Sequence, residues 1–110
     1  MDNDRGMIVL TTVADEASAQ RIAHAVVAAR LAACVTQLPG VISTYRWEGQ
    51  MQQNTEVLML IKTTEGAYPA LAEEIERLHD YELPELLAVP VDKGSPAYLS
   101  WLAAAVNTKE

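Results

Sequence analysis

One histidine of this chain lies within a few residues of three acidic side chains. An imidazole and several carboxylates can therefore converge on a cation within one turn of backbone. Imidazole suits copper, zinc and nickel, whereas carboxylate oxygens suit harder ions. The predicted donors are His79, Asp80, Glu82 and Glu85. Their spacing matches no closed zinc pattern. The alternative to a metal site is that His79 interacts favourably with the negative end of the dipole of the preceding helix, while the acidic side chains are solvated.

Groups suited to nucleophilic catalysis are scarce. Such catalysis needs a base beside a serine or cysteine, and the chain has two histidines and one cysteine. Cys34 lies between Ala33 and Val35 without a basic neighbour in sequence, which predicts a buried, inert thiol. His24 lies off the apolar side of a predicted helix. A phosphatase-like hydrolase would need an anion cradle, but Thr11–Glu16 has no glycine and ends in two acids. We expect no catalytic residues.

The charge balance excludes two classes of partner. Fifteen acidic against eight basic residues give a net charge of -7, which repels nucleic acid and anionic lipid surfaces. No apolar run approaches the length of a membrane span. Met1–Gly6 is polar and lacks the apolar core of a secretory signal, and a single cysteine permits no intrachain disulfide. We expect no nucleic-acid or membrane partner and a cytoplasmic location.

The hydrophobic pattern predicts a flexible extension over residues 1–6 and one domain over residues 7–110. A Pro-Gly pair inside the second strand predicts a bulge, and Thr12 with Asp15 predicts a capping box. The order of elements predicts an α+β, ferredoxin-like βαββαβ sandwich with a long central hairpin and a C-terminal helix. The predicted elements are strands at Met7–Val13, Ala32–Trp47, Thr55–Thr64 and Leu86–Val91, helices at Asp15–Arg30 and Tyr68–Leu78, a hairpin connection at Glu48–Asn54, and a short last helix from Ser95-Pro96.

The predicted hairpin is too long for the helices that should cover it. A helix over Asp15–Arg30 spans about 24 Å at roughly 1.5 Å per residue. A strand over Ala32–Trp47 spans about 50 Å at roughly 3.3 Å per residue when unbent. The projecting end carries too much apolar surface for water, so we expect other copies of the chain to cover it. The predicted interface residues are Tyr45, Trp47, Met51, Val57 and Met59.

Short motifs along nearly the whole chain resemble the CutA divalent-cation tolerance family. The resemblance implies a ferredoxin-like subunit in a homotrimer, similar in architecture to the PII signal-transduction proteins. It also implies a link to tolerance of divalent metals, chiefly copper, with no settled catalytic activity. The motifs are Leu31-Ala32-Ala33-Cys34, Leu38-Pro39-Gly40-Val41, Tyr45-Arg46-Trp47-Glu48-Gly49, Ile61-Lys62-Thr63-Thr64, Tyr68-Pro69-Ala70-Leu71, His79-x-Tyr81-x-x-Pro84-Glu85 and Gly94-Ser95-Pro96-Ala97-Tyr98-Leu99-x-Trp101.

Two positions depart from the family pattern in a way that weakens a metal site. Members assigned a copper site resemble one another in a cysteine late in the first strand and a pair of histidines before the tyrosine. Here Thr11 stands at the first position, and Leu78-His79 replaces the pair. Asp80 stands where the family usually has proline and adds an oxygen donor. We expect weak or moderate metal binding, centred on His79.

These observations favour a non-enzymatic homotrimer that takes part in tolerance of, or response to, divalent metal ions such as copper. No cofactor is obligatory, and a bound divalent cation would be the cofactor implied. The alternative is a PII-like sensor that binds a small molecule in clefts between subunits and reports to a protein partner that the sequence does not identify.

Overall fold

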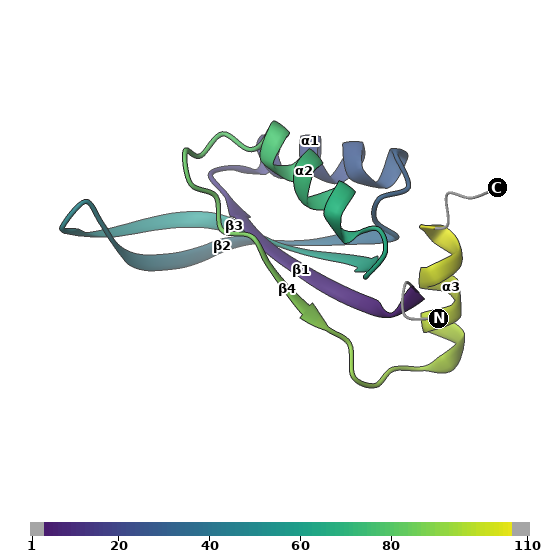
Figure 1. Ribbon diagram of the computed structural model, residues 1–110. Helices are drawn as coiled ribbons and strands as arrows, with labels where there is room; N and C mark the ends of the chain where they lie inside the picture. The colour runs from purple at the N-terminus through teal and green to yellow at the C-terminus, as the bar shows by residue number, and fades with distance from the viewer. Residues whose placement is uncertain (1–3, 107–110) are drawn as a thin grey trace.

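Four strands form one antiparallel sheet, and three helices lie around it (Figure 1). The computed structural model describes residues 4–106, so predictions for residues 1–3 and 107–110 lie outside the described residues. The sheet order is β2-β3-β1-β4, which confirms the predicted α+β, ferredoxin-like class. The elements are β1 (Gly6–Val13), α1 (Glu16–Ala28), β2 (Cys34–Trp47), β3 (Gln50–Thr64), α2 (Tyr68–Leu78), β4 (Leu87–Pro90) and α3 (Pro96–Ala105).

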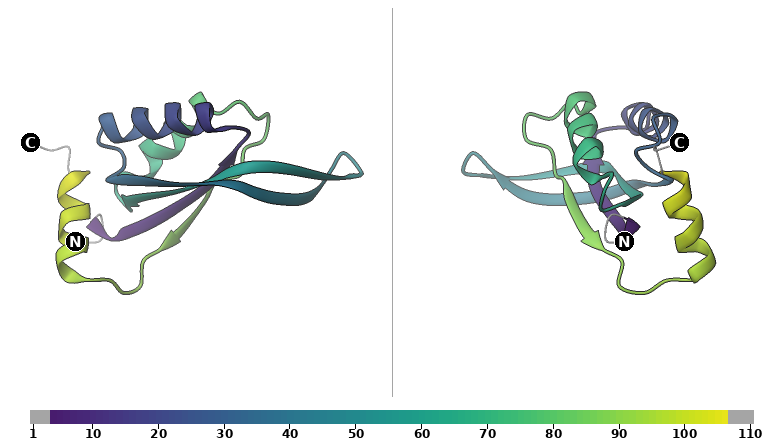
Figure 2. Two further views of the ribbon diagram at one scale, coloured as in Figure 1. Left: turned by 180° about the vertical axis from the view of Figure 1, so that it is seen from behind. Right: turned by 45° about the vertical axis from the view of Figure 1, so that its right-hand side comes forward.

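The helices cover the sheet unequally. α1 and α2 lie side by side on one face, whereas α3 stands at the end of the sheet where β1 begins (Figures 1 and 2). One hydrophobic core fills the space between α1, α2 and the sheet, and α3 adds the separate buried residues Leu102 and Val106. The largest members of the core are Val9, Ile22, Met59, Ile61, Leu71 and Ile75.

The β2–β3 hairpin projects far beyond the helices, as predicted, and gives the molecule a length of 46 Å (Figure 1). Its connection is shorter than predicted. Glu48 and Gly49 have φ values of 52° and 79°, the positive angles of a two-residue type I′ turn, and β3 begins at Gln50. Most of the polar segment predicted as a connection is therefore strand, because ladder pairing to β2 holds polar residues extended.

Two local predictions have different outcomes. The bulge is confirmed: the register shifts between Leu38 and Val41, and Gly40 has a φ of 78°. The predicted capping box, with Thr12 as the cap and Asp15 three residues later, is wrong in both positions. Asp15 is the N-cap of α1, and its carboxylate accepts a hydrogen bond of 2.8 Å from the Ser18 amide, which lowers the pKa of Asp15. Thr12 instead belongs to β1.

Two buried threonines on the helix-covered face of the sheet differ in their hydrogen bonding. The Thr63 hydroxyl donates to the Leu31 carbonyl oxygen at 2.7 Å. The Thr11 hydroxyl is fully buried and has no hydrogen-bond partner among the described residues. A buried hydroxyl without a partner is destabilising, because it has lost its hydrogen bonds to water without replacement.

The substitution Thr11→Val should therefore stabilise the fold by about 1 kcal/mol, since valine keeps the branched shape and removes the orphaned hydroxyl. Thr63→Val is the matched control and should cost about 1 kcal/mol or more, because it leaves the Leu31 carbonyl without its donor. Chemical denaturation of the two variants and the parent protein measures both changes. A destabilised Thr11→Val variant would contradict this account.

Candidate functional site

A cleft of about 770 Å³ opens beside the end of β1, between the projecting part of the hairpin and residues 79–86. The cleft forms because β1 stops at Val13, opposite Val57, while β3 continues into the hairpin. Residues 79–86 link α2 to β4 and pass along the space that β1 leaves (Figure 1). The lining side chains come from these segments: Thr12, Ser43, Thr44, Tyr45, Trp47, Asn54, Glu56, Tyr81, Glu82, Leu83, Pro84 and Glu85.

A buried acid and a tyrosine face each other in this cleft. Glu56 is only 5% exposed, and the Tyr81 hydroxyl donates a hydrogen bond of 2.5 Å to its Oε2 atom. Burial raises the pKa of Tyr81 well above its ordinary value, and the hydrogen bond to Glu56 and its negative charge raise it further. The phenol therefore stays neutral and keeps donating its proton toward Glu56 over the physiological pH range.

His79 fixes the segment that carries Tyr81. The Tyr81 amide donates to His79 Nδ1 at 3.1 Å, so the ring proton must sit on Nε2. Nε2 is 2.8 Å from the Thr12 carbonyl oxygen, to which it donates. The His79 and Tyr81 rings also contact each other, with centroids 4.7 Å apart. A neutral imidazole with both nitrogens engaged thus ties the end of α2 to the end of β1.

The four predicted metal donors do not converge in the structure. Asp80 turns toward α1, where its carboxylate lies 3.5 Å from Arg21 and accepts from the Ser18 hydroxyl at 3.2 Å. Glu82 and Glu85 are exposed and line the cleft instead. Within residues 4–106, no group of three or more His, Cys, Asp or Glu side chains is arranged to hold a metal ion. Metal binding by these residues remains a prediction.

The predicted interface residues fall into two groups. Tyr45, Trp47 and Met51 are exposed on the hairpin, by 40%, 37% and 75%. Val57 and Met59 are buried in the chain's own core, so the prediction that they need cover from another copy was wrong. The reason is register: both lie at the base of the hairpin, where β3 pairs with β1, and face α1 and α2 rather than solvent.

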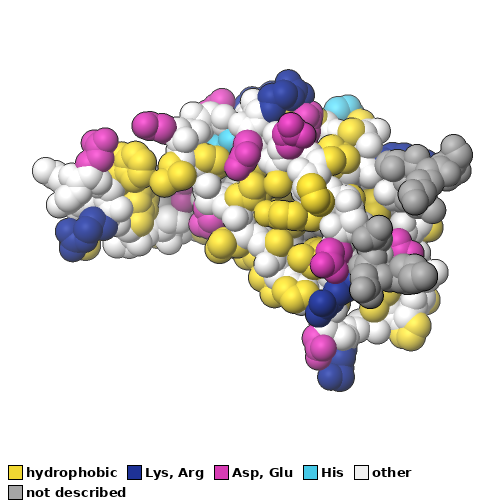
Figure 3. All heavy atoms as spheres, in the orientation of Figure 1, with side chains coloured by type: hydrophobic (Ala, Val, Ile, Leu, Met, Phe, Trp, Pro, Cys, Tyr) yellow, Lys and Arg dark blue, Asp and Glu magenta, His cyan; other side chains and the backbone are white. Residues whose placement is uncertain are grey.

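A larger apolar surface, which the sequence reasoning missed, lies on the face of the sheet opposite α1 and α2. Strand pairing places Leu58 beside Leu38, Leu60 beside Leu10, and Val89 beside Ile8 on that face. Leu38, Leu87 and Val89 are 40%, 59% and 50% exposed. We call this the open face; its apolar side chains are Ile8, Leu10, Leu38, Leu58, Leu60, Leu87 and Val89. In Figure 3, with α1 and α2 at the top and β4 in front as in Figure 1, hydrophobic side chains also gather over the middle of the molecule.

A sequence signal for the open face did exist. Val57–Ile61 is an unbroken apolar run on the central strand β3, and a strand that reads apolar at every position has both faces covered. Thr12 pairs with Leu58 and also lines the cleft, so the cleft borders the open face.

Cys34 is only half-buried, so the prediction of a buried thiol was wrong. Its sulfur lies 3.6 Å from the Tyr98 hydroxyl, and the hydrogen bond to Cys34 raises the pKa of Tyr98. Tyr98 and Trp101 are both half-exposed on α3 with ring centroids 5.5 Å apart. Cys34 starts β2 on the open face, where only α3 reaches it, which accounts for its partial exposure.

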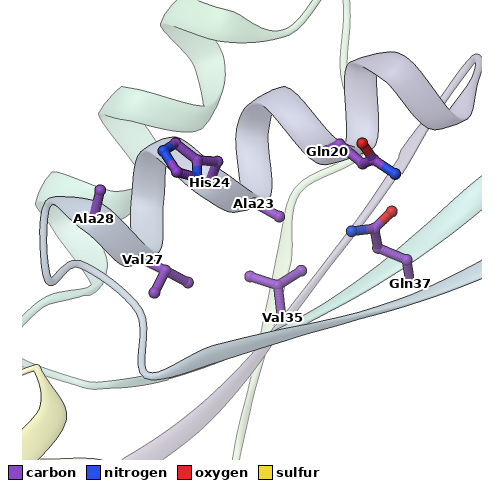
Figure 4. A pocket seen from close by; sticks show the side chains of 7 residues that line it. All are labelled: Gln20, Ala23, His24, Val27, Ala28, Val35 and Gln37. Atoms are coloured by element: carbon purple, nitrogen blue, oxygen red, sulfur yellow. The ribbon is translucent and has the colours of Figure 1, made fainter.

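A shallower groove of about 490 Å³ runs between α1 and the edge strand β2 (Figure 4). Its floor is apolar, with Ala23, Val27 and Val35, and His24 is its one titratable group. His24 is exposed, as predicted from its place off the apolar side of α1. This groove brings no pair of chemically reactive side chains together, so the cleft at Glu56 is the stronger candidate site.

The fold and the cleft define a small ferredoxin-like α+β protein with one uncovered sheet face. Residues 7–105 match the family described as CutA1 divalent ion tolerance protein. The chain is 47% identical over 95 residues to the divalent-cation tolerance protein CutA of Thermus thermophilus, covering 86% of this chain and 92% of that protein. This chain therefore belongs to the CutA1 divalent ion tolerance family.

Solved structures agree with this assignment. The CutA crystal structure from Xylella fastidiosa has a TM-score of 0.92 at 42% identity and covers 94% of this chain and 99% of its own. CutA1 from Oryza sativa has a TM-score of 0.93 at 35% identity and covers 99% of this chain and all of its own. A relative from Archaeoglobus fulgidus, 29% identical, is described as periplasmic. No helix within residues 4–106 has the length and apolar character to cross a bilayer.

Ultraviolet titration of the four tyrosines should reveal the Tyr81–Glu56 contact. The native pKa of Tyr81 is raised, so its contribution to stability is fully present below the unfolded value, about pH 10, and is lost as pH rises through the native value. Tyr81 should thus ionise last, together with alkaline unfolding. Tyr81→Phe should remove this late step, whereas the control Tyr68→Phe should retain it. Early ionisation of all four phenols would refute the contact.

Proposed function

We propose that this chain acts in tolerance of, or response to, divalent metal ions such as copper, as a non-enzymatic homotrimer. The observation that carries the metal role is 47% identity, across most of the chain, to proteins named for divalent-cation tolerance. The engagement of both His79 ring nitrogens supports the absence of catalysis, because neither is free to act as a base. We propose the cytoplasm as its location because it has one cysteine, although one relative is described as periplasmic.

The open face supports assembly. Its leucines and valines form a contiguous apolar surface, which a monomer in water would rarely leave uncovered. β2 and β4 are edge strands, whose free backbone groups can extend the sheet into another copy. Tyr45 and Trp47 lie on the same side of the hairpin as Glu56 and Leu58 and continue this surface, whereas Met51 lies on the other side of the hairpin. Another copy of the chain is the occupant, since identical subunits closing a ring cover every such surface; the number three rests on the family resemblance.

Sedimentation equilibrium should give about 36 kDa, three times the 12.0 kDa chain. Leu87→Glu should dissociate the trimer, because a carboxylate would lose its hydration in the interface. Leu87 is 59% exposed in one chain, so the subunit itself can tolerate the change. Val27→Glu, at a 40% exposed position on the opposite, helical side, is the matched control and should leave the mass unchanged. A folded wild-type monomer at micromolar concentration would refute the trimer.

The metal site of this proposal is the segment with His79, Asp80, Glu82 and Glu85. A cation could bind the imidazole only by displacing the Thr12 carbonyl or the Tyr81 amide, so binding should be weak. The carboxylates would have to move as well, because Asp80 points toward Arg21 while Glu82 and Glu85 face the cleft.

Calorimetric titration with Cu²⁺ tests this site. Affinity should fall as pH drops through the histidine range, since a protonated imidazole cannot ligate. His79→Ala should weaken binding, whereas His24→Ala, at the exposed histidine of α1, should not. Equal affinity of wild type and His79→Ala would remove His79 from the site. The tolerance role is tested separately: the gene should restore growth on copper to a bacterium that lacks its own CutA.

The second candidate function is a PII-like sensor of a small molecule. The observation that favours it is the cleft at Glu56, whose volume falls in the range of small-molecule sites, about 300–1,000 Å³. Thr12 links this cleft to the open face, so a ligand there would lie next to a subunit boundary. Such a ligand could report to a protein partner through the assembly.

A further inference from the structure

The cleft contains a largely buried carboxyl group, Glu56, that forms no ion pair with a basic side chain among the described residues. Glu56 is 5% exposed, and the Tyr81 hydroxyl donates the one hydrogen bond that its side chain receives within the described part of the chain. None of the described lining residues is Lys or Arg. Two more acids, Glu82 and Glu85, stand along the same cleft. A carboxylate withdrawn from water is costly without a positive partner, so the cleft favours a cation.

The aromatic and apolar side chains that line the cleft favour an organic ligand over a bare metal ion. Tyr45 and Trp47 line it from the hairpin, and Leu83 and Pro84 line it from the segment before β4. The Tyr45 hydroxyl accepts a hydrogen bond of 2.5 Å from Asn54 Nδ2, which orients that ring. Aromatic faces attract ammonium and guanidinium groups, and the remaining apolar surface can cover carbon atoms.

The arrangement of donors argues against a metal ion as the occupant. A divalent cation needs several ligands within about 2–2.6 Å of one point. Residues 4–106 contain no group of three His, Cys, Asp or Glu side chains arranged in that way. An ammonium or guanidinium needs only hydrogen bonds to one or two carboxylates, with its charge spread over a larger group.

We propose that this cleft binds an organic cation at the boundary between neighbouring copies of the chain. An ammonium or guanidinium contacts Glu56, and an apolar or aromatic body lies against the parts of Trp47 and Tyr45 that the neighbouring copy leaves uncovered. The inference goes beyond the metal role. It rests on the small-molecule alternative above and names the class of ligand for it. The rival occupant is a basic side chain of a neighbouring copy, such as Arg46 of the hairpin, which would fill the cleft in place of a free amine.

Calorimetry on the full chain with three probes of similar shape tests the class of ligand. Phenethylammonium should bind at millimolar concentrations, one molecule per chain, whereas neutral phenylethanol and anionic phenylpropionate should not. Equal binding of the three, or binding of none, would overturn the proposal. Absence of binding in wild type that is recovered in Arg46→Gln would also overturn it, because it would assign the cation to another subunit.

Variants locate the charge that the ligand contacts. Glu56→Gln should weaken phenethylammonium binding about tenfold or more, since it removes a charge-assisted hydrogen bond. Glu76→Gln on α2, an exposed acid outside the cleft lining, is the matched control and should bind as wild type does.

Tyr81→Phe should retain binding, and the ligand should raise its melting temperature more than that of wild type, because the ammonium replaces the lost donor to Glu56. Loss of binding in Tyr81→Phe, or wild-type binding in Glu56→Gln, would refute this contact.

Sedimentation and copper titration on the same preparations distinguish failure of the organic-cation inference from failure of the proposed trimer and metal site. If the protein is a trimer and binds copper but not phenethylammonium, the organic-cation inference alone fails. If phenethylammonium binds with the predicted charge dependence while copper does not, the inference stands and the metal site fails.

Discussion

β3 is apolar on both faces over Val57–Ile61, but among residues 4–106 the helices α1 and α2 cover only one of these faces. Val57, Met59 and Ile61 face α1 and α2 and complete the core, while Leu58 and Leu60 alternate with them and face the other way. Strand geometry permits no other outcome, since successive side chains point to opposite sides of a sheet. α3 reaches only the end of that second face, near Cys34 and the start of β1. The subunit is therefore incomplete as a packing unit, and the assembly proposed above follows from β3.

The same strand produces the cleft. β3 is longer than β1. Beyond Val57, the edge of β3 that pairs with β1 has no partner strand, and residues 79–86 flank it instead. These residues need an anchor, and His79 supplies it by bonding the Thr12 carbonyl with one nitrogen and the Tyr81 amide with the other. Tyr81 is thereby directed at Glu56, the next β3 residue after the β1 partner ends. The histidine that sequence reasoning marks as a ligand thus links two segments that line the cleft.

The sequence predicted the elements well because their signals are local. Period-two and period-3.6 patterns, Pro39-Gly40 and the Ser95-Pro96 start of α3 each depend on a few neighbouring residues. Apart from the capping box at Thr12 and the length of the connection after Trp47, the errors concern contacts between distant segments. Burial of Val57 and Met59 depends on where β1 pairs with β3, and the direction of Asp80 depends on Arg21 and Ser18 of α1. The Glu56–Tyr81 pair spans 25 residues and belongs to no motif that a linear pattern can display. The open face is an exception. Its sequence signal, the apolar run Val57–Ile61 of β3, is local, but the sequence analysis did not use it.

The proposed assembly and the proposed ligand site share one part of the chain, because Thr12 belongs to both regions. Its backbone carbonyl receives the His79 proton, its position pairs with Leu58 on the open face, and it lines the cleft. A neighbour that covers Leu58 must therefore pack within a residue or two of the strand end that anchors the Tyr81 segment. Conversely, a ligand that replaces the Tyr81 donor at Glu56 changes the forces on the same strand end. If both proposals hold, such a shared element would let binding in the cleft and contact across the open face bias one another, which is the thermodynamic requirement for a sensor built from identical subunits.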